Sequence, residues 1–329
     1  MLAPIYHSPQ LSIYKIEGKN DLIFNRYIVS SAESRDLCND PQICGFEYTQ
    51  KLQAVCLLIL ENLSSFSPVK LREDKALVLN ILNTGINFGI REALAKAYGW
   101  NIHQNHYVYD HKNELATSDH YKEYNLPQDT QIIFGDIITN PQYLKQNLSE
   151  IIHLAEKEGR QIQNIVLFTL SSELIEDPLI EIAIECKKKF KQFAGIDLFY
   201  LEGRFVLAEE NTPLKLKKNG QDLVCKDALL APEFISSQYE LPFYPLERSV
   251  IYSAETRADN IPEYVEDVIK YWEEVRNLAM QGYEFEFLLK ERFPNIDGSK
   301  FGKQNLMSLA EQHITKLTRL LQPKTNIIE

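Results

Sequence analysis

The sequence has little basic charge relative to its acidic charge. Its 35 Lys and Arg residues are outnumbered by 46 Asp and Glu residues, which gives a formal net charge of −11 at pH 7. A chain with this balance carries no strong positive field toward nucleic acid or anionic lipid. We therefore expect neither nucleic acid nor a membrane surface among its partners.

Paired cysteines and long apolar runs are also missing. The five cysteines are an odd number, and their spacings match neither a disulfide framework nor a zinc ribbon. No stretch approaches the roughly eighteen continuous apolar residues of a membrane-spanning helix, and the first residues show no basic segment followed by an apolar core. These absences predict a cytoplasmic protein.

Three common catalytic motifs are absent. The sequence contains no Gly-x-Ser-x-Gly, no Gly-x-x-x-x-Gly-Lys-Ser/Thr and no His-Glu-x-x-His. These absences argue against a standard hydrolase nucleophile elbow, a P-loop and a zincin site.

What is present is an alternation of strand and helix patterns in a chain of 329 residues, of which 44% are hydrophobic. Such alternation favours an α/β fold with a central, mainly parallel sheet and helices on both faces. The expected strands are 76–82, 106–109, 131–135, 164–170 and 196–201, and the expected helices between them are 86–98, 141–158 and 179–193.

The two flanks differ in character from this core. Residues 1–60 combine short β-like pieces with an amphipathic helix that begins at Phe46, and we expect them to form an N-terminal cap or hood. Residues 61–203 form the predicted α/β core. Residues 204–329 form a C-terminal extension of mixed α/β to helical character, with a hairpin after 204 and helices at 262–281 and 303–321.

Two runs in the core carry the strongest functional signal. Each is an apolar strand that ends in a polar turn and continues into a helical pattern: 75–94, with the turn Asn83-Thr84-Gly85, and 131–144. Such turns place backbone N–H groups and a helix N-terminus beside a crevice suited to anions. Two of them in one chain predict a phosphate-rich ligand, although an ordinary strand-to-helix turn also fits each run taken singly.

The second run resembles the signature of type I phosphoribosyltransferases, in which an apolar strand leads into two acidic residues and a Thr/Gly-rich loop. The resemblance implies that Asp136, at the place of the second acid, holds the ribose hydroxyls and Mg²⁺. It also implies that Thr139, Asn140 and Gln142 lie along the loop that receives the 5′-phosphate. The run departs from the family pattern because Gly135 stands at the place of the first acid.

The first run resembles the pyrophosphate loop of the same family, with Asn83, Thr84 and Gly85 as the ligand-binding turn. In the family, a long segment between the two loops closes over the substrate and supplies a cation to the developing pyrophosphate charge. Here the interval 101–130 is polar, and Lys112 is the candidate catalytic cation. Lys122 is a second candidate, and a solvated surface lysine is the alternative for either.

The resemblance implies a phosphoribosyltransferase-like protein that binds phosphoribosyl pyrophosphate or a nucleotide together with Mg²⁺ and transfers phosphoribosyl to or from a nitrogenous base. One alternative is a catalytically inactive ligand sensor or protein-interaction scaffold with the same fold. Another is a nucleotide-binding α/β protein of a different lineage. Aromatic residues of the extension, among them Tyr264, Trp272 and Phe287, suit either its core or a homodimer contact.

Overall fold

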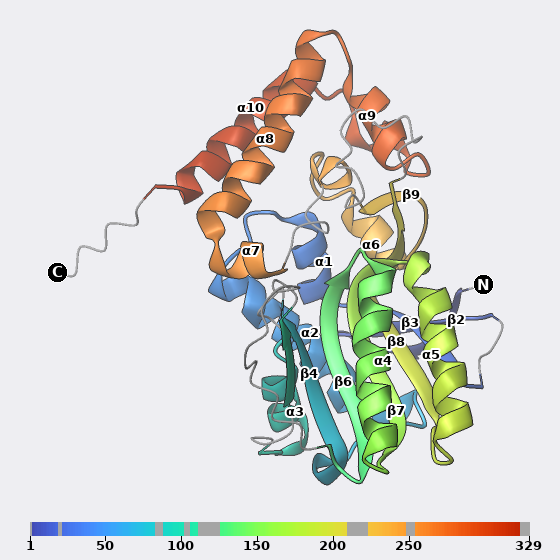
Figure 1. Cartoon of the computed structure of the whole chain (residues 1–329). Helices are drawn as coiled ribbons and strands as arrows, with labels where there is room; N and C mark the ends of the chain where they lie inside the picture. The colour runs from blue at the N-terminus through green and yellow to red at the C-terminus, as the bar shows by residue number, and fades with distance from the viewer. Residues whose placement is uncertain are drawn as a thin grey trace.

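The computed structural model describes residues 2–18, 22–82, 88–101, 106–110, 126–208, 223–247 and 254–322. Within them, the apolar runs form one nine-stranded sheet (Figure 1). The strands are β1 (Leu2–His7), β2 (Ser12–Ile16), β3 (Phe24–Ser30), β4 (Ala76–Leu82), β5 (His106–Asp110), β6 (Asp129–Ile138), β7 (Gln161–Ser172), β8 (Gly195–Leu207) and β9 (Leu223–Leu230).

The helices of the described residues lie between and after these strands. They are α1 (Ala32–Asn39), α2 (Phe46–Asn62), α3 (Ile90–Tyr98), α4 (Pro141–Lys157), α5 (Glu176–Lys189), α6 (Pro232–Ser237), α7 (Ala254–Asp259), α8 (Ile261–Met280), α9 (Phe285–Arg292) and α10 (Leu306–Leu320). Helices α4 and α5 pack side by side on one face of the sheet, and α2 and α3 pack on each other on the opposite face (Figure 1). The prediction of an α/β fold with a mainly parallel sheet flanked by helices is confirmed.

The order of the strands in space is β1-β2-β3-β8-β7-β6-β4-β5, and β9 pairs with β8. All pairings from β3 to β5 along this order are parallel. Counted along the chain from β4, the strands β5-β4-β6-β7-β8 have the order 2-1-3-4-5 of one common class of doubly wound sheets. In such sheets the chain reverses its direction of winding at one point, here between β4 and β6.

The N-terminal segment extends this sheet. Strands β1, β2 and β3 form an antiparallel meander, and β3 then pairs in parallel with β8, from Phe24 opposite Ile196 to Val29 opposite Leu201. Of the short β-like pieces of the sequence, β1 becomes an edge strand and β2 and β3 lie inside the sheet, and only α1 and α2 lie outside its plane.

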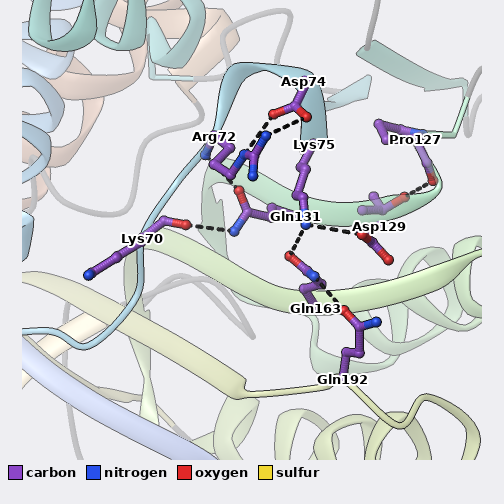
Figure 2. A network of polar contacts seen from close by, with 10 residues as sticks. Lys70, Arg72, Asp74, Lys75, Pro127, Asp129, Gln131, Gln163 and Gln192 are labelled. Carbon is purple, nitrogen blue, oxygen red and sulfur yellow. Dashed lines mark hydrogen bonds and ion pairs between the residues drawn. The ribbon is translucent and has the colours of Figure 1, made fainter.

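The amino-terminal edge of the core is closed by a polar network (Figure 2). Lys75, before β4, donates from Nζ to Asp129 at 3.0 Å. The buried amide of Gln131 accepts from Arg72 N at 2.8 Å and donates to Lys70 O at 2.9 Å. Because these groups are paired with one another, the network fixes the register of β4 against β6 at the edge opposite the predicted site.

The C-terminal extension lies beyond the carboxyl ends of the core strands (Figure 1). Helices α8 and α10 pack on each other as a long hairpin, and the buried Trp272 of α8 donates from Nε1 to Glu247 at 2.9 Å. Glu247 also lies 3.2 Å from Nε2 of the buried His313 on α10. In the described part of the chain, every helix is too short or too polar to cross a membrane.

Candidate functional site

The two predicted loops leave neighbouring strands at the same edge of the sheet. Strand β4 pairs with β6 only from Ala76 to Val78 and then pairs with β5 alone, whereas β6 pairs with β7 as far as Ile138. Ligands of doubly wound sheets bind at the carboxyl ends of the strands where the winding reverses. The topology therefore places the ends of β4 and β6 at the position expected of a ligand site.

Several predicted residues lie outside the described part of the chain. Asn83, Thr84 and Gly85 follow directly after β4, and Lys112 follows shortly after β5. Their proposed contacts stay predictions, and the site is built below from the residues of β6, α4 and their neighbours.

Asp136 lies near the carboxyl end of β6 with 5% of its surface exposed. Its Oδ1 accepts a hydrogen bond from the backbone N–H of Ile137 at 2.8 Å. Burial raises the pKa of Tyr48 on α2 to about 12, and the charge of Asp136 adds to this rise while Arg257 opposes it. The Asp136 carboxylate is thus within electrostatic range of Tyr48 on α2.

Gly135 lies in direct contact with Phe88, the buried residue that precedes α3. A Cβ atom placed on Gly135 would lie 2.7 Å from Cβ and from Cγ of Phe88. Phe88 has φ +57°, which is uncommon for a bulky residue, and Gly89 after it is also left-handed, with φ +62°. The position of the family's first acid is therefore filled by an aromatic ring from the other run.

The N-terminus of α4 is capped by the chain's own side chain. Asn140 accepts at Oδ1 from the backbone N–H groups of Gln142 and Tyr143, at 3.0 and 3.3 Å. Pro141 has no N–H to offer. The predicted phosphate-binding residues Thr139, half-buried, and Asn140 and Gln142, both exposed, are brought together. The amides of the first turn, however, are already engaged.

No protein-family model, curated protein or solved structure matches this chain.

The fit of Mg²⁺ to Asp136 depends on what the ligand supplies. Within the described ranges, no three His, Cys, Asp or Glu side chains gather as a metal site. Magnesium is commonly bound through one or two carboxylates together with substrate phosphates and water. Asp136 alone therefore fits Mg²⁺ only when a phosphorylated ligand brings further oxygens.

The neighbouring strand β7 ends in hydroxyl residues that stabilise β6. Thr169 Oγ1 donates to Asp136 O at 2.8 Å, and Ser171 Oγ donates to Ile138 O at 2.5 Å. Ser172 accepts from Leu174 N, so it caps the short helix that leads into α5. The contacts of Ser171 and Ser172 are therefore structural, since one joins β7 to β6 and the other caps a helix.

Arg204 on β8 takes part in ion pairs. Its guanidinium lies 3.1 Å from Glu176 and 3.3 Å from Glu173. The same Glu176 pairs with the buried Arg26 at 2.8 Å. This arrangement ties β3 and β8 to the start of α5 and accounts for Arg204 without an anionic ligand.

Sequence reasoning missed one buried acid at this edge, Glu202. It interrupts the apolar stretch of β8, is 0% exposed and has φ +61°. A glutamate inside an apolar strand run is unusual, because a buried carboxylate needs polar partners. Its position in the run was the sequence signal that could have identified it. Its partners come from the first turn of α1, which no pattern in the sequence places beside β8.

Helix α4 carries a buried side-chain amide that makes no hydrogen bond among the described residues. Asn147 is 0% exposed, and neither its Oδ1 nor its Nδ2 has a hydrogen-bond partner among the described residues. An unsatisfied buried polar group costs roughly 1–3 kcal/mol. Asn147→Leu, which keeps the number and branching of the side-chain heavy atoms and removes the amide, is expected to raise the free energy of unfolding in urea by about 1 kcal/mol.

Asn140→Ala on the same helix provides the contrast. Because it removes the N-cap, it should lower the free energy of unfolding by about 1 kcal/mol. A destabilised Asn147→Leu protein would show that the amide is satisfied in solution.

Proposed function

We propose that this chain binds a nucleotide or another phosphoribosyl ligand at the carboxyl edge of its sheet, where β4 and β6 diverge, without transferring the phosphoribosyl group. The observation that carries the proposal is the reversal of winding between β4 and β6. It supports a ligand site at Asp136 and the carboxyl end of β4.

The role of Asp136 follows from its chemistry. A carboxylate accepts hydrogen bonds from the two hydroxyls of a ribose, and such charge-assisted bonds are about twice as strong as neutral ones. Asp136 would also hold Mg²⁺ if the ligand carries a pyrophosphate. The strand order is shared by several kinds of nucleotide-binding sheets, so a ligand site of another lineage fits it equally.

Two contacts argue against transfer chemistry. Phe88 fills the space at Gly135, the place of the first acid in the phosphoribosyltransferase pattern. Asn140 engages the amides of Gln142 and Tyr143 that would receive a 5′-phosphate. A site with one acid and a capped helix binds a sugar more readily than it stabilises a migrating ribosyl cation. Active phosphoribosyl transfer stays the second candidate because Asp136 is retained.

Calorimetry with phosphoribosyl pyrophosphate, AMP and GMP, each with and without Mg²⁺, tests the proposal. We expect saturable binding of at least one of these ligands, and we expect Asp136→Asn to weaken it roughly tenfold to a hundredfold, the loss of a charged hydrogen-bond acceptor. Asparagine retains an oxygen for Ile137 N–H, so the fold should persist.

Asp129→Asn is the matched control, because Asp129 lies on the same strand at the opposite edge and pairs with Lys75. It should leave binding unchanged. Absence of heat with all three ligands at millimolar concentration would reject the proposal. Release of pyrophosphate with a panel of purines, pyrimidines and nicotinate would establish the enzyme in its place.

A further inference from the structure

The buried carboxylate of Glu202 joins the sheet to the first turn of α1. Its Oε2 accepts from Ser30 Oγ at 2.7 Å, and its Oε1 accepts from Ser31 N at 3.1 Å and from Ser34 Oγ. Ser30 ends β3, whereas Ser31 and Ser34 form the capping box of α1. One side chain thus holds the end of one strand and the beginning of one helix.

The other end of α1 holds the C-terminal extension. Asn39 donates to Ser237 Oγ at 2.9 Å and accepts from Gln238 Nε2 at 2.7 Å. Arg257 of α7 donates to Leu37 O at 2.9 Å and to Asp40 O at 2.6 Å. Helix α1 therefore links the sheet, at Glu202, to the extension.

The surroundings of Glu202 make it the group in this cluster that changes charge near neutral pH. Burial raises the pKa of Glu202 to about 7, although the serine donors and Arg35 favour its charged form. Burial also raises the pKa of Tyr14 on β2 to about 12 and that of Cys38 on α1 well above its usual value. Both of these groups stay neutral between pH 5 and 8.

The remaining charged neighbours of Glu202 are Arg35 and Glu233. Arg35 donates to Ser30 Oγ at 2.8 Å. Glu233 of α6 accepts from Tyr14, and hydrogen bonds lower its pKa despite partial burial. A change of charge in this part of the interface between pH 5 and 7 therefore comes from Glu202.

We propose that Glu202 is a pH switch that sets how firmly α1, and with it the C-terminal extension, is attached to the sheet. The neutral acid suits the buried site and can donate to a serine oxygen, whereas the carboxylate is buried at a desolvation cost. The switch is separate from the proposed ligand site at Asp136 and does not depend on it.

The sign of the effect follows from linkage. The pKa of Glu202 in the folded chain, about 7, lies above its ordinary value of 4.5, so the folded state holds a proton that the open state releases. Stability from this proton is fully present below pH 4.5 and is lost as the pH rises to 7. For one linked proton, the opening equilibrium constant of α1 rises roughly tenfold per pH unit in that window.

Amide hydrogen exchange of the full chain between pH 5 and 8 tests this, with protection factors used so that the intrinsic pH dependence of exchange is removed. We expect the protection of α1 to fall roughly tenfold per pH unit up to pH 7 and to level off above it. Glu202→Gln should make the protection of α1 independent of pH. Ser34→Ala removes a donor to the carboxylate and should move the transition to higher pH.

Two control variants separate Glu202 from other titrating groups. Asp197 is a second buried acid on β8, bonded to Ser67 and Asn25, and Asp197→Asn should leave the pH slope of α1 unchanged. His7 is exposed and bonded to Ser12 on β2, and His7→Asn should also leave it unchanged. The proposal is overturned if α1 shows no pH slope, if Glu202→Gln retains it, or if either control removes it.

Discussion

Arg257→Met is expected to lower the free energy of unfolding by about 4 kcal/mol, because a buried guanidinium that donates to several carbonyls is lost at once. Arg257 is 1% exposed and donates to Leu37 O, Asp40 O and Ile43 O at 2.6–2.9 Å. Two of these carbonyls end α1 and have no partner within the helix. Methionine would fill part of the volume and satisfy none of them.

Urea unfolding followed by circular dichroism measures this loss. Arg276→Met on α8 is the control, because Arg276 is about one-third exposed and lies 3.8 Å from Glu273. Pairs of this kind contribute roughly 0–1 kcal/mol. A loss below about 1 kcal/mol for Arg257→Met would show that these bonds contribute little to the attachment of the extension.

Gly135→Ala is expected to destabilise the chain by about 2–3 kcal/mol through overpacking. The added Cβ would lie 2.7 Å from Cβ and Cγ of Phe88, and Phe88 has no room to retreat because it is 0% exposed. Phe88→Ala alone should cost about 3–5 kcal/mol as a cavity. The double variant should lose less than the sum, with a coupling of about 1–2 kcal/mol.

Gly159→Ala is the comparison that separates the cost of a steric contact, as in Gly135→Ala, from the cost of backbone strain. Gly159 has φ +67° and nothing within 4 Å of its added Cβ, so its cost is conformational, about 1 kcal/mol. Losses that add up exactly in the Gly135/Phe88 cycle would mean that the two residues do not contact each other in solution.

This contact also decides whether the family's missing acid can be restored. Gly135→Asp in the parent chain should fail to fold well, since a carboxylate needs more room than the methyl group that already collides with Phe88. The absence of the acid is thus built into the packing of α3 on β6. Phe88 from the first run and Gly135 from the second thus hold each other in place.

Much of the core could be predicted because its signals are local. The apolar run at 76–82 coincides with β4. Pro141 marks the first residue of α4, and Gly159 lies just after its last residue. These signals depend on side-chain periodicity and on backbone rules that act within a few residues. Helix α8, expected at 262–281 and found at Ile261–Met280, was readable for the same reason.

What the sequence could not reveal is set by contacts between distant segments. The length of β8 was underestimated because its last residues pair with β9. They follow an irregular stretch between Tyr200 and Arg204 in the pairing with β7, which contains Glu202 and which no local pattern marks. Only the three-dimensional structure shows that Phe88 fills the space beside Gly135. It also shows that the Asn140 side chain caps the start of α4. Arg257 gave no sequence signal, because its partners are main-chain carbonyls.

The pairing of β3 with β8 has a consequence for the order of events during synthesis. Asn25 on β3 and Asp197 on β8, which are bonded to each other, are 172 residues apart. At 5–20 residues per second, a ribosome would need roughly 9–34 s between them. During that interval the meander of β1 to β3 has an open edge at β3, and emergence of β8 from the ribosome is the event that covers this edge.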